Sequence, residues 1–287
     1  MALWELTGYI PVLAIIGVLF AWAYFRPTWK GRKPVKEKLL RGPGESLQIK
    51  IEELTEKLVL PFIFMLGIGM ALGTFTSRMV QHGGSLKLEF LTGVWSFGLI
   101  TMILCGARVL HVSRLLADYN LGSSGERAVG EELNKLMLDG CLVYHDLVAD
   151  NWNIDHVVIA QSGIFAIETK TYRKKLGKGE DFYKVKFDGE TLHFPNRTDR
   201  KPVEQAIRNA GWLSEMLREA LIESIRVEPI LTLPGWWIDR EGKGQVAVLN
   251  HREFRQCIVK KGPAQLSEKQ MRQIAYQIEQ RCRNVTF

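Results

Sequence analysis

The stretch from Asn153 to Lys170 reads NIDHVVIAQSGIFAIETK and decides the fold of the polar half of the chain. Two short runs rich in β-branched and aromatic residues flank Gln161-Ser162-Gly163, which is the pattern of two strands joined by a tight turn. Side chains alternate between the two faces of a strand, so Glu168 and Lys170 are expected on one face. Asp155, near the start of the partner strand, should come across from the end of the second strand. The stretch therefore predicts a β-hairpin that gathers three charged groups near its open end.

Two carboxylates and a lysine in this arrangement suit the hydrolysis of a phosphodiester bond. Carboxylates can hold Mg²⁺, a hard cation that prefers oxygen ligands and keeps several waters. A nearby lysine can orient the attacking water or help to deprotonate it, and both cations offset the negative charge that grows on the phosphate. Glu-x-Lys also occurs on many solvated strands, so the pattern by itself leaves a structural ion pair as the alternative.

The segments on both sides of the hairpin are predicted to be helices. Residues 125–136 carry apolar side chains at helical spacing, and Ser123 or Ser124 is expected to cap this helix. Glu126 falls on the same apolar stripe, so its carboxylate either caps the helix or serves a site. Downstream of the hairpin, Pro202 lies in the first turn of another expected helix, where its missing N–H costs nothing.

Four sequence blocks in this order resemble the NERD (nuclease-related) domain, a branch of the PD-(D/E)XK nuclease superfamily. They are Gly-Glu near a helix start, NIDHVV, GIFAIETK and Pro-x-x-Gln-Ala, and together they span about Gly122 to Leu233. The resemblance implies an α/β fold with an αβββαβ core. It also implies that the active-site positions are Glu126, Asp155, Glu168, Lys170 and Gln205.

The resemblance further implies a role for each of these five residues. Asp155 and Glu168 would bind the metal, and Glu126 would complete the acidic cluster directly or through water. Lys170 would position the attacking water, and Gln205 would orient the lysine or the phosphate. The implied cofactor is Mg²⁺, with Mn²⁺ as its alternative.

A basic cluster directly follows the Glu-x-Lys strand and is the candidate for binding nucleic acid. The rest of the chain gives no such indication, because from His111 onward 26 Lys or Arg stand against 24 Asp or Glu, and most of the net charge of +7 comes from the first 110 residues. A solvated turn is the alternative for the cluster, although a phosphodiester site needs phosphate-binding residues nearby. The cluster consists of Arg173, Lys174, Lys175 and Lys178.

Three apolar runs in the first third of the chain are candidate membrane spans. They cover Thr7 to Phe25, Leu58 to Phe75 and Phe90 to Ala107, and at about 1.5 Å per residue each can cross a hydrocarbon core of roughly 30 Å with its flanks. The loop from 26 to 57 holds nine Lys or Arg against five Asp or Glu. The positive-inside rule therefore places this loop, and everything after Arg108, in the cytoplasm and the amino terminus outside.

Two features of this region concern how its helices associate. The segment from Leu47 to Leu58 is expected to form a short amphipathic helix on the membrane surface. Gly69 and Gly73 form a small-xxx-small pair that would let two helices pack closely, and a homo-oligomer through the spans follows as one expectation.

The remaining soluble segments predict further α/β structure. A hairpin is expected from Phe182 to Phe194 around Asp188-Gly189, and a long amphipathic helix from Val203 to Leu221. His156, beside Asp155, should point to the opposite strand face, so packing is favoured over a role as a ligand. The other expected elements are strands at Val227 to Leu233 and Gln245 to Leu249, and a helix from Ser267, its cap, to Arg281.

The sequence therefore predicts two parts: a membrane domain, residues 1–110, and a cytoplasmic NERD-like domain, residues 111–287 with its core at about 122–250. Four cysteines without a CxxC pair fit a reducing compartment and no structural zinc. The expected function is that of a multi-pass protein of the cytoplasmic (inner) membrane with Mg²⁺-dependent nuclease activity. The expected partners are nucleic acid, with DNA favoured over RNA, and the lipid bilayer. The alternative is a noncatalytic, membrane-tethered module that binds nucleic acid or protein.

Overall fold

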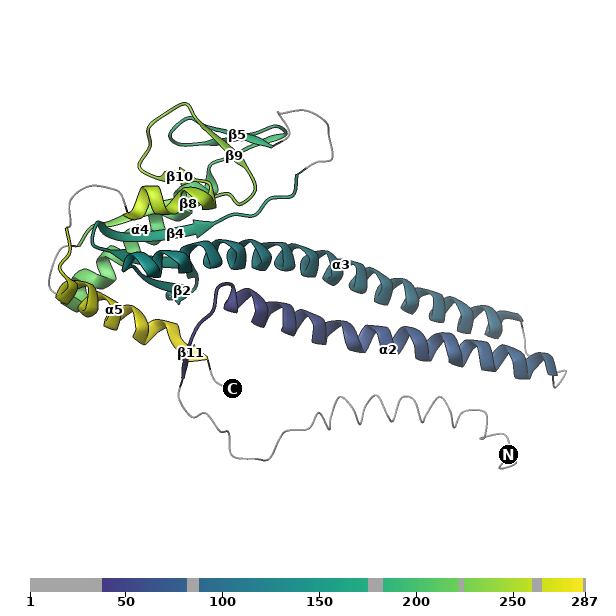
Figure 1. Ribbon diagram of the computed structural model, residues 1–287. Helices are drawn as coiled ribbons and strands as arrows, with labels where there is room; N and C mark the ends of the chain where they lie inside the picture. Colours follow the sequence, from purple (N-terminus) through teal and green to yellow (C-terminus); the bar gives the residue numbers. More distant parts are fainter. Residues whose placement is uncertain (1–37, 82–87, 175–182, 222–224, 260–264, 286–287) are drawn as a thin grey trace. The chain divides into compact units, whose positions relative to one another are not determined.

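The computed structural model describes residues 38–81, 88–174, 183–221, 225–259 and 265–285 (Figure 1). The first expected span, Thr7 to Phe25, lies outside the described residues. The described residues divide into two compact units: one lies within 50–118, and the other within 38–49 and 119–285. The second unit is therefore built from two separate stretches of sequence, whereas the sequence-based division at residue 110 included only the later one.

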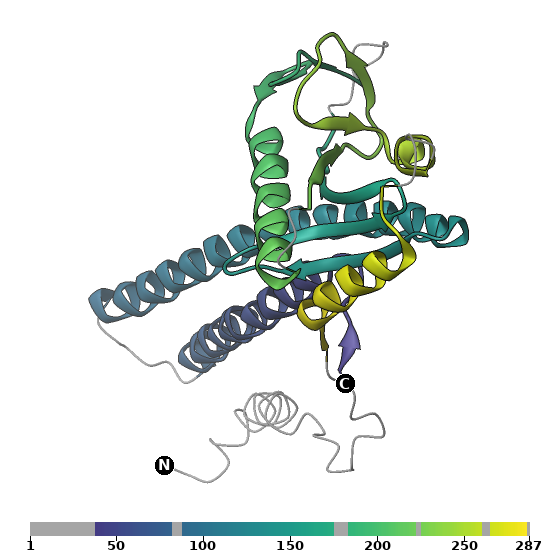
Figure 2. The same cartoon turned by 90° about the vertical axis from the view of Figure 1, so that its left-hand side faces the viewer.

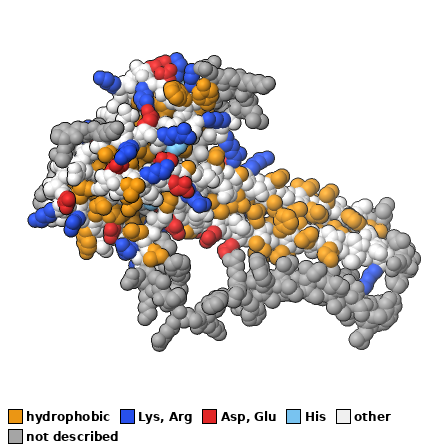
Figure 3. All heavy atoms as spheres, in the orientation of Figure 1, with side chains coloured by type: hydrophobic (Ala, Val, Ile, Leu, Met, Phe, Trp, Pro, Cys, Tyr) orange, Lys and Arg blue, Asp and Glu red, His pale blue; other side chains and the backbone are white. Residues whose placement is uncertain are grey.

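The described part of the first unit consists of segments of two long helices, α2 (Glu45–Gln81) and α3 (Leu88–Asn134). Both helices are long and apolar enough to cross a membrane, and their most apolar stretches bury almost none of their side chains against protein. Figure 3 shows these hydrophobic side chains along the helices. The expected second and third spans lie within α2 and α3.

The packing of the two helices differs from the glycine-based expectation. A Cβ atom built on Gly98 would come within 2.5 Å of the Leu72 side chain, so the absence of a side chain at Gly98 permits the close approach of α3 to α2. No described atom lies within 4 Å of such a Cβ at Gly69 or Gly73. The small-xxx-small pair thus takes no part in this contact.

Two predicted helix boundaries are wrong. The segment from Leu47 to Leu58 is the beginning of α2 and no separate helix, and the helix expected after Ser123 or Ser124 is the end of α3, which runs unbroken from Leu88. Neither serine caps a helix: Ser124 Oγ donates a hydrogen bond to the carbonyl of Asn120 at 2.8 Å, one turn earlier. No proline interrupts α3 between its apolar part and Glu126, so the helix continues.

The second unit is a mixed α/β structure around a five-stranded sheet of order β10-β8-β4-β3-β2. The hairpin expected around Gln161 is confirmed as β3 (Asn153–Ala160) and β4 (Gly163–Thr169), with His156 opposite Ile167. β2 pairs antiparallel with β3, whereas β8 and β10 run parallel to β4. The remaining strands of this sheet are β2 (Leu142–Val148), β8 (Val227–Thr232) and β10 (Ala247–Leu249).

Helices cover both faces of this sheet. One face packs against α4 (Lys201–Leu221) and α5 (Glu268–Cys282), which Figure 2 shows in green and yellow. The other face packs against the end of α3 and the π-helix η5 (Arg255–Val259), through Val129, Leu133 and Ile258. The expected helices from Val203 and Ser267 are confirmed, and Ser267 caps α5 in a capping box with Gln270.

A second sheet of order β7-β6-β5-β9 has its own apolar core. The hairpin expected around Asp188-Gly189 is confirmed, because β5 (Lys184–Phe187) pairs antiparallel with β6 (Leu192–Phe194). The other two strands are β7 (Arg197–Asp199) and β9 (Trp237–Arg240). The short helices η2 (Lys135–Asp139) and η4 (His251–Glu253) and the two-stranded pair of β1 (Leu39–Leu40) with β11 (Arg283–Val285) complete the described elements.

Candidate active site

The hairpin register brings the charged residues at its open end together. His156 lies opposite Ile167, so the next step along the ladder sets Asp155 opposite Glu168 on adjacent strands. The Nζ of Lys170 lies 2.8 Å from Oε1 of Glu168. The backbone N–H of Thr169 donates a hydrogen bond to Oδ2 of Asp155 at 2.7 Å, which fixes this carboxylate beside the end of β4.

Helix α3 carries the third carboxylate, that of Glu126, and passes very close to Thr171 at the preceding residue, Gly125. A Cβ atom on Gly125 would lie 1.7 Å from Oγ1 of Thr171, so only glycine lets the helix pass so near to the residue that follows Lys170. Glu126, the next residue, interacts electrostatically with both Glu168 and Lys170. The structure thus brings together four of the five residues proposed from the sequence.

The carboxyl groups of the site have raised pKa values. Burial, followed by the charges of Asp146 and Glu168, raises the pKa of Glu126 to about 8. Burial, followed by the charges of Glu168 and Glu126, raises the pKa of Asp155 well above its ordinary value. Burial also raises the pKa of Glu168, against the opposing charge of Lys170. Three carboxylates therefore share one nearby lysine, and the site favours a further cation or a proton.

The pKa of Lys170 itself is raised. Burial alone would lower this pKa, but the charge of Glu168 and the hydrogen bond to it outweigh that effect, and Asp155 and Glu126 add to the attraction. Lys170 is therefore an ammonium that donates hydrogen bonds, not a neutral amine that could act as a base.

The fifth proposed residue, Gln205, makes no hydrogen bond with any of these groups among the described residues. Asn209, one turn further along α4, does contact the cluster: its Nδ2 donates to Oε2 of Glu168 at 2.8 Å. Asn209 and Glu168 are both almost fully buried. Residues four apart share a helix face, so Gln205 lies on the same face of α4 as Asn209, and its role stays a prediction.

The basic cluster after β4 is only partly described, because Lys175 and Lys178 lie outside the described residues. Arg173 and Lys174 are exposed. The ammonium of Lys174 donates to the carbonyl of Gly235 and lies 5.4 Å from the ring centre of Trp236. Lys174 is therefore held against the loop that precedes β9.

His156 is packed, as expected. It is fully buried, and its Nδ1 lies 2.9 Å from Nδ1 of His145, whose Nε2 contacts Oδ1 of Asn134 at 3.0 Å. Burial lowers the pKa values of both histidines, so they are neutral near pH 7. The pair belongs to the core beneath the site.

A segment remote in the sequence borders the site, and neither the hairpin nor the helix patterns indicated it. Residues Leu39–Ser46, here called the strap, comprise β1, the loop that follows it and the first two residues of α2. Arg41 donates to Oδ2 of Asp146 from Nε at 2.9 Å and from Nη2 at 2.7 Å, and both side chains are almost fully buried. The backbone N–H of Ser46 donates to the same oxygen at 2.6 Å, and Asn153 Nδ2 donates to Oδ1 at 2.7 Å.

The strap also reaches the carboxylate of Glu126. Gly44 has a positive φ of 75°, and a Cβ there would lie 3.6 Å from Oε2 of Glu126 and 3.4 Å from Oγ of Ser123. On the strand side, Asp146 has a φ of 51°, which is uncommon for a residue other than glycine. The paired residues on either side of it set Asp146 opposite Asp155. The strap therefore forms part of the wall around the acidic residues.

The three carboxylates of the site provide oxygen atoms that can bind a divalent metal. Carboxylate oxygens, which this site supplies from buried Glu168 and half-buried Asp155 and Glu126, are the ligands that Mg²⁺ and Mn²⁺ prefer. Within the described ranges, however, no three His, Cys, Asp or Glu side chains are arranged to hold a metal ion together. The three carboxylates are thus not a preformed cage, and a metal here would have fewer protein ligands and more water, as is usual for Mg²⁺.

Comparison with known proteins supports the resemblance found in the sequence. One match is an uncharacterised protein of Bacillus anthracis, 39% identical over 56 residues, which are 18% of this chain and 26% of that protein. The chain thus covers about a quarter of that relative's length. No solved structure matches. The family model of the nuclease-related domain, NERD, matches residues 121–234, and this match indicates a nuclease-related domain that spans the site from α3 to the end of β8.

Proposed function

We propose that the second unit is a metal-dependent nuclease that hydrolyses phosphodiester bonds in nucleic acid. The observation that carries the proposal is the charged cluster at the end of the hairpin, where Asp155 and Glu168 interact electrostatically and the ammonium of Lys170 lies 2.8 Å from Glu168. The match to the nuclease-related domain adds support. DNA is the favoured substrate and RNA the alternative.

The residues take distinct roles in this proposal. Asp155 and Glu168 would hold Mg²⁺ or Mn²⁺, with Glu126 as a further ligand directly or through water; the metal would activate the attacking water and offset charge on the phosphate. Lys170, as a charged donor, orients the water or the phosphate oxygen. Asn209 holds Glu168 in place through its amide, and Gln205 lies on the same helix face.

The direct test is incubation of the purified full chain with single-stranded and duplex DNA and RNA, in Mg²⁺, Mn²⁺ or EDTA. Cleavage that requires the metal would support the proposal. A protein that binds nucleic acid but cleaves none of these substrates would favour the noncatalytic binding module.

Metal binding can be checked without cleavage, by melting curves at several pH values. The folded-state pKa of Glu126, about 8, lies above its ordinary value of 4.5, so the folded protein holds this proton more tightly than the unfolded chain. The stabilisation of the folded state by this proton is present at low pH and is lost as the pH rises from about 5 to about 8. Mg²⁺ should raise the melting temperature over the same pH range. At 100 times its Kd, a bound ion adds about 2.7 kcal/mol to the free energy of unfolding. The absence of any Mg²⁺ effect at pH 8 would contradict a metal at these carboxylates.

We further propose that α2 and α3 anchor the protein in the cytoplasmic membrane, with the second unit in the cytoplasm. Their length and apolar, protein-free surfaces support this placement. A reporter fused after Phe287 should be cytoplasmic, and one inserted between Gln81 and Ser85 should be external. A reporter after Phe287 that is found outside would separate the nuclease from its substrate and contradict the arrangement.

A further inference from the structure

A cavity of about 490 Å³ lies beside the second sheet, between β9 and η4. Its volume is within the range of small-ligand sites, which is about 300–1,000 Å³. Aromatic and charged side chains form its wall together, a combination typical of sites that bind planar, charged molecules. The wall consists of Tyr183, Gly235, Trp236, Trp237, Ile238, Arg240, Asn250, His251, Arg252 and Glu253.

Two large aromatic side chains at this cavity are exposed. Trp237 is 63% exposed and Tyr183 is 38% exposed. They are neighbours, because the backbone N–H of Trp237 donates to the carbonyl of Tyr183 at 2.9 Å. Packing does not explain an exposed tryptophan next to an exposed tyrosine, whereas both rings are free to stack on a planar ligand.

Two buried nitrogen atoms in the wall have no hydrogen-bond partner within the described part of the chain. They are Nε1 of Trp236 and Nδ1 of His251. Trp236 is only 3% exposed, and its ring packs edge-on against Phe194. A buried indole N–H normally finds an acceptor, so this wall holds a donor that no described residue satisfies.

The cavity is close to the candidate active site along the chain. Lys174, which contacts Gly235 and Trp236, is four residues after Lys170. Four extended residues span at most about 14 Å. Tyr172, between Lys170 and Lys174 in the sequence, packs edge-to-face against Phe194, whose ring also packs edge-to-face against Trp236. A continuous row of aromatic rings thus leads from the end of β4 to the cavity.

We propose that this cavity binds an unpaired base of single-stranded nucleic acid, next to the bond that is cleaved at the candidate active site. This inference rests on the proposed nuclease function and specifies its substrate class. Trp237 and Tyr183 stack on the base. Arg240 is engaged by Glu253, so exposed Arg252 is the cation that meets the phosphate. A base inside a duplex is stacked on both faces and paired along one edge. It cannot enter the cavity unless it first unpairs and unstacks.

The test measures the binding of fluorescein-labelled oligonucleotides to the full chain in detergent micelles, in EDTA so that no cleavage occurs. The probes are a 15-nucleotide oligothymidylate, its RNA counterpart and a 15-base-pair duplex. Trp237→Ala should weaken binding of the single strands about tenfold or more, on the scale of losing one base–aromatic stack. Trp237→Phe should retain most of the affinity, because the ring is kept. Melting temperatures should be unchanged, since Trp237 is exposed.

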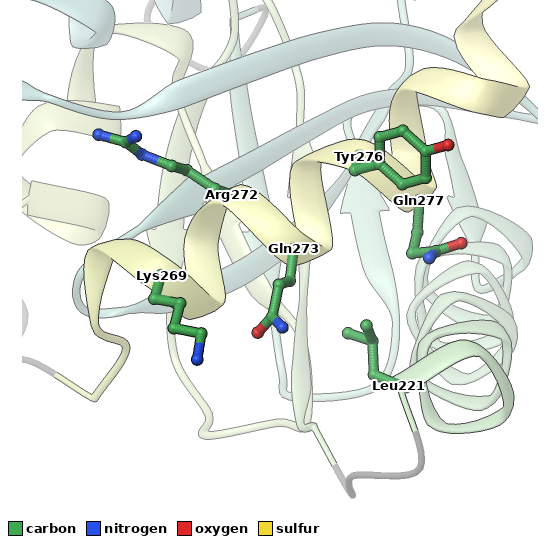
Figure 4. Close-up of a pocket in the computed structure, with 6 residues that line it drawn as sticks. All are labelled: Leu221, Lys269, Arg272, Gln273, Tyr276 and Gln277. Atoms are coloured by element: carbon green, nitrogen blue, oxygen red, sulfur yellow. The ribbon is translucent and has the colours of Figure 1, made fainter.

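Tyr276→Ala is the matched control. Tyr276 is 62% exposed and lies on α5 at another surface depression, which Lys269 and Arg272 also line (Figure 4). Its removal should leave the affinity unchanged. Equal losses in Tyr276→Ala and Trp237→Ala, wild-type affinity in Trp237→Ala, or tighter binding of the duplex than of the single strands would each overturn the proposal.

The outcomes also separate this inference from the nuclease proposal. Binding of single strands through Trp237 by a protein that cleaves nothing in Mg²⁺ would support the base site and contradict the nuclease. Metal-dependent cleavage that Trp237→Ala leaves unchanged, with unchanged affinity, would contradict the base site alone.

Discussion

Lys170→Ala is expected to lower the rate of metal-dependent cleavage by about 10²-fold or more, the scale of losing one catalytic group. The ammonium lies at the acidic cluster but donates hydrogen bonds and holds no metal, so the affinity for Mg²⁺ should be largely kept. Asp155→Ala should lose both cleavage and metal affinity. Turnover, metal affinity and melting temperature measured on the same three proteins check these results.

If the ion pair between Glu168 and Lys170 has only a structural role, a different result is expected. In that case Lys170→Ala would lower the melting temperature and leave turnover per folded molecule unchanged. Lys135→Ala is a suitable control, because Lys135 also pairs with a glutamate, Glu132 at 2.6 Å, but on an exposed surface and with none of the three site carboxylates. Wild-type turnover by a well-folded Lys170→Ala protein would remove the catalytic role of Lys170.

Arg41→Ala is expected to lower the free energy of unfolding of the second unit by about 3–5 kcal/mol, because it leaves the carboxylate of Asp146 buried without its cation. This loss is large against a typical domain stability of about 5–15 kcal/mol. Denaturant unfolding of the full chain, followed by tryptophan fluorescence, measures it. Arg41→Lys should recover only part of the stability, since lysine cannot reproduce the two guanidinium contacts.

The matched control for Arg41 is Arg218→Ala. Arg218 pairs with Glu215 on the exposed face of α4, so its removal should change the unfolding free energy little. A double variant, Arg41→Ala with Asp146→Asn, should be less destabilised than the sum of the two single variants, because the buried charge is removed with its partner. Equal, small effects of Arg41→Ala and Arg218→Ala would show that the strap does not support the unit.

The strap also has a practical consequence. A fragment that begins at residue 111 lacks Arg41 and the whole of β1, which pairs with β11, so we expect it to be less stable than the full chain. Cleavage assays should therefore keep residues 35–49. The strap also lies against Ser123 and Glu126 at Gly44, so the fragment would lack this neighbour of the site as well.

Local patterns in the sequence determined the hairpin and its charged end. Strict alternation along the chain fixed Glu168 and Lys170 on one face, and the short turn around Ser162 fixed Asp155 opposite Glu168, because both follow from neighbouring residues alone. Capping chemistry identified Ser267 as a helix start for the same reason. The four blocks that resemble the NERD domain lie in the part of the chain that its family model matches.

Only the tertiary structure decided which distant groups complete the site. Asn209, 41 residues from Glu168, binds that carboxylate because of the depth at which α4 packs on the sheet. Helical periodicity predicts which face of α4 is buried but not this depth, so the sequence did not single out Asn209. Arg41 and Asp146 are 105 residues apart and carry no local signal. Their contact arises because two stretches of sequence fold into one unit, and a buried charge requires a partner wherever in the chain that partner lies.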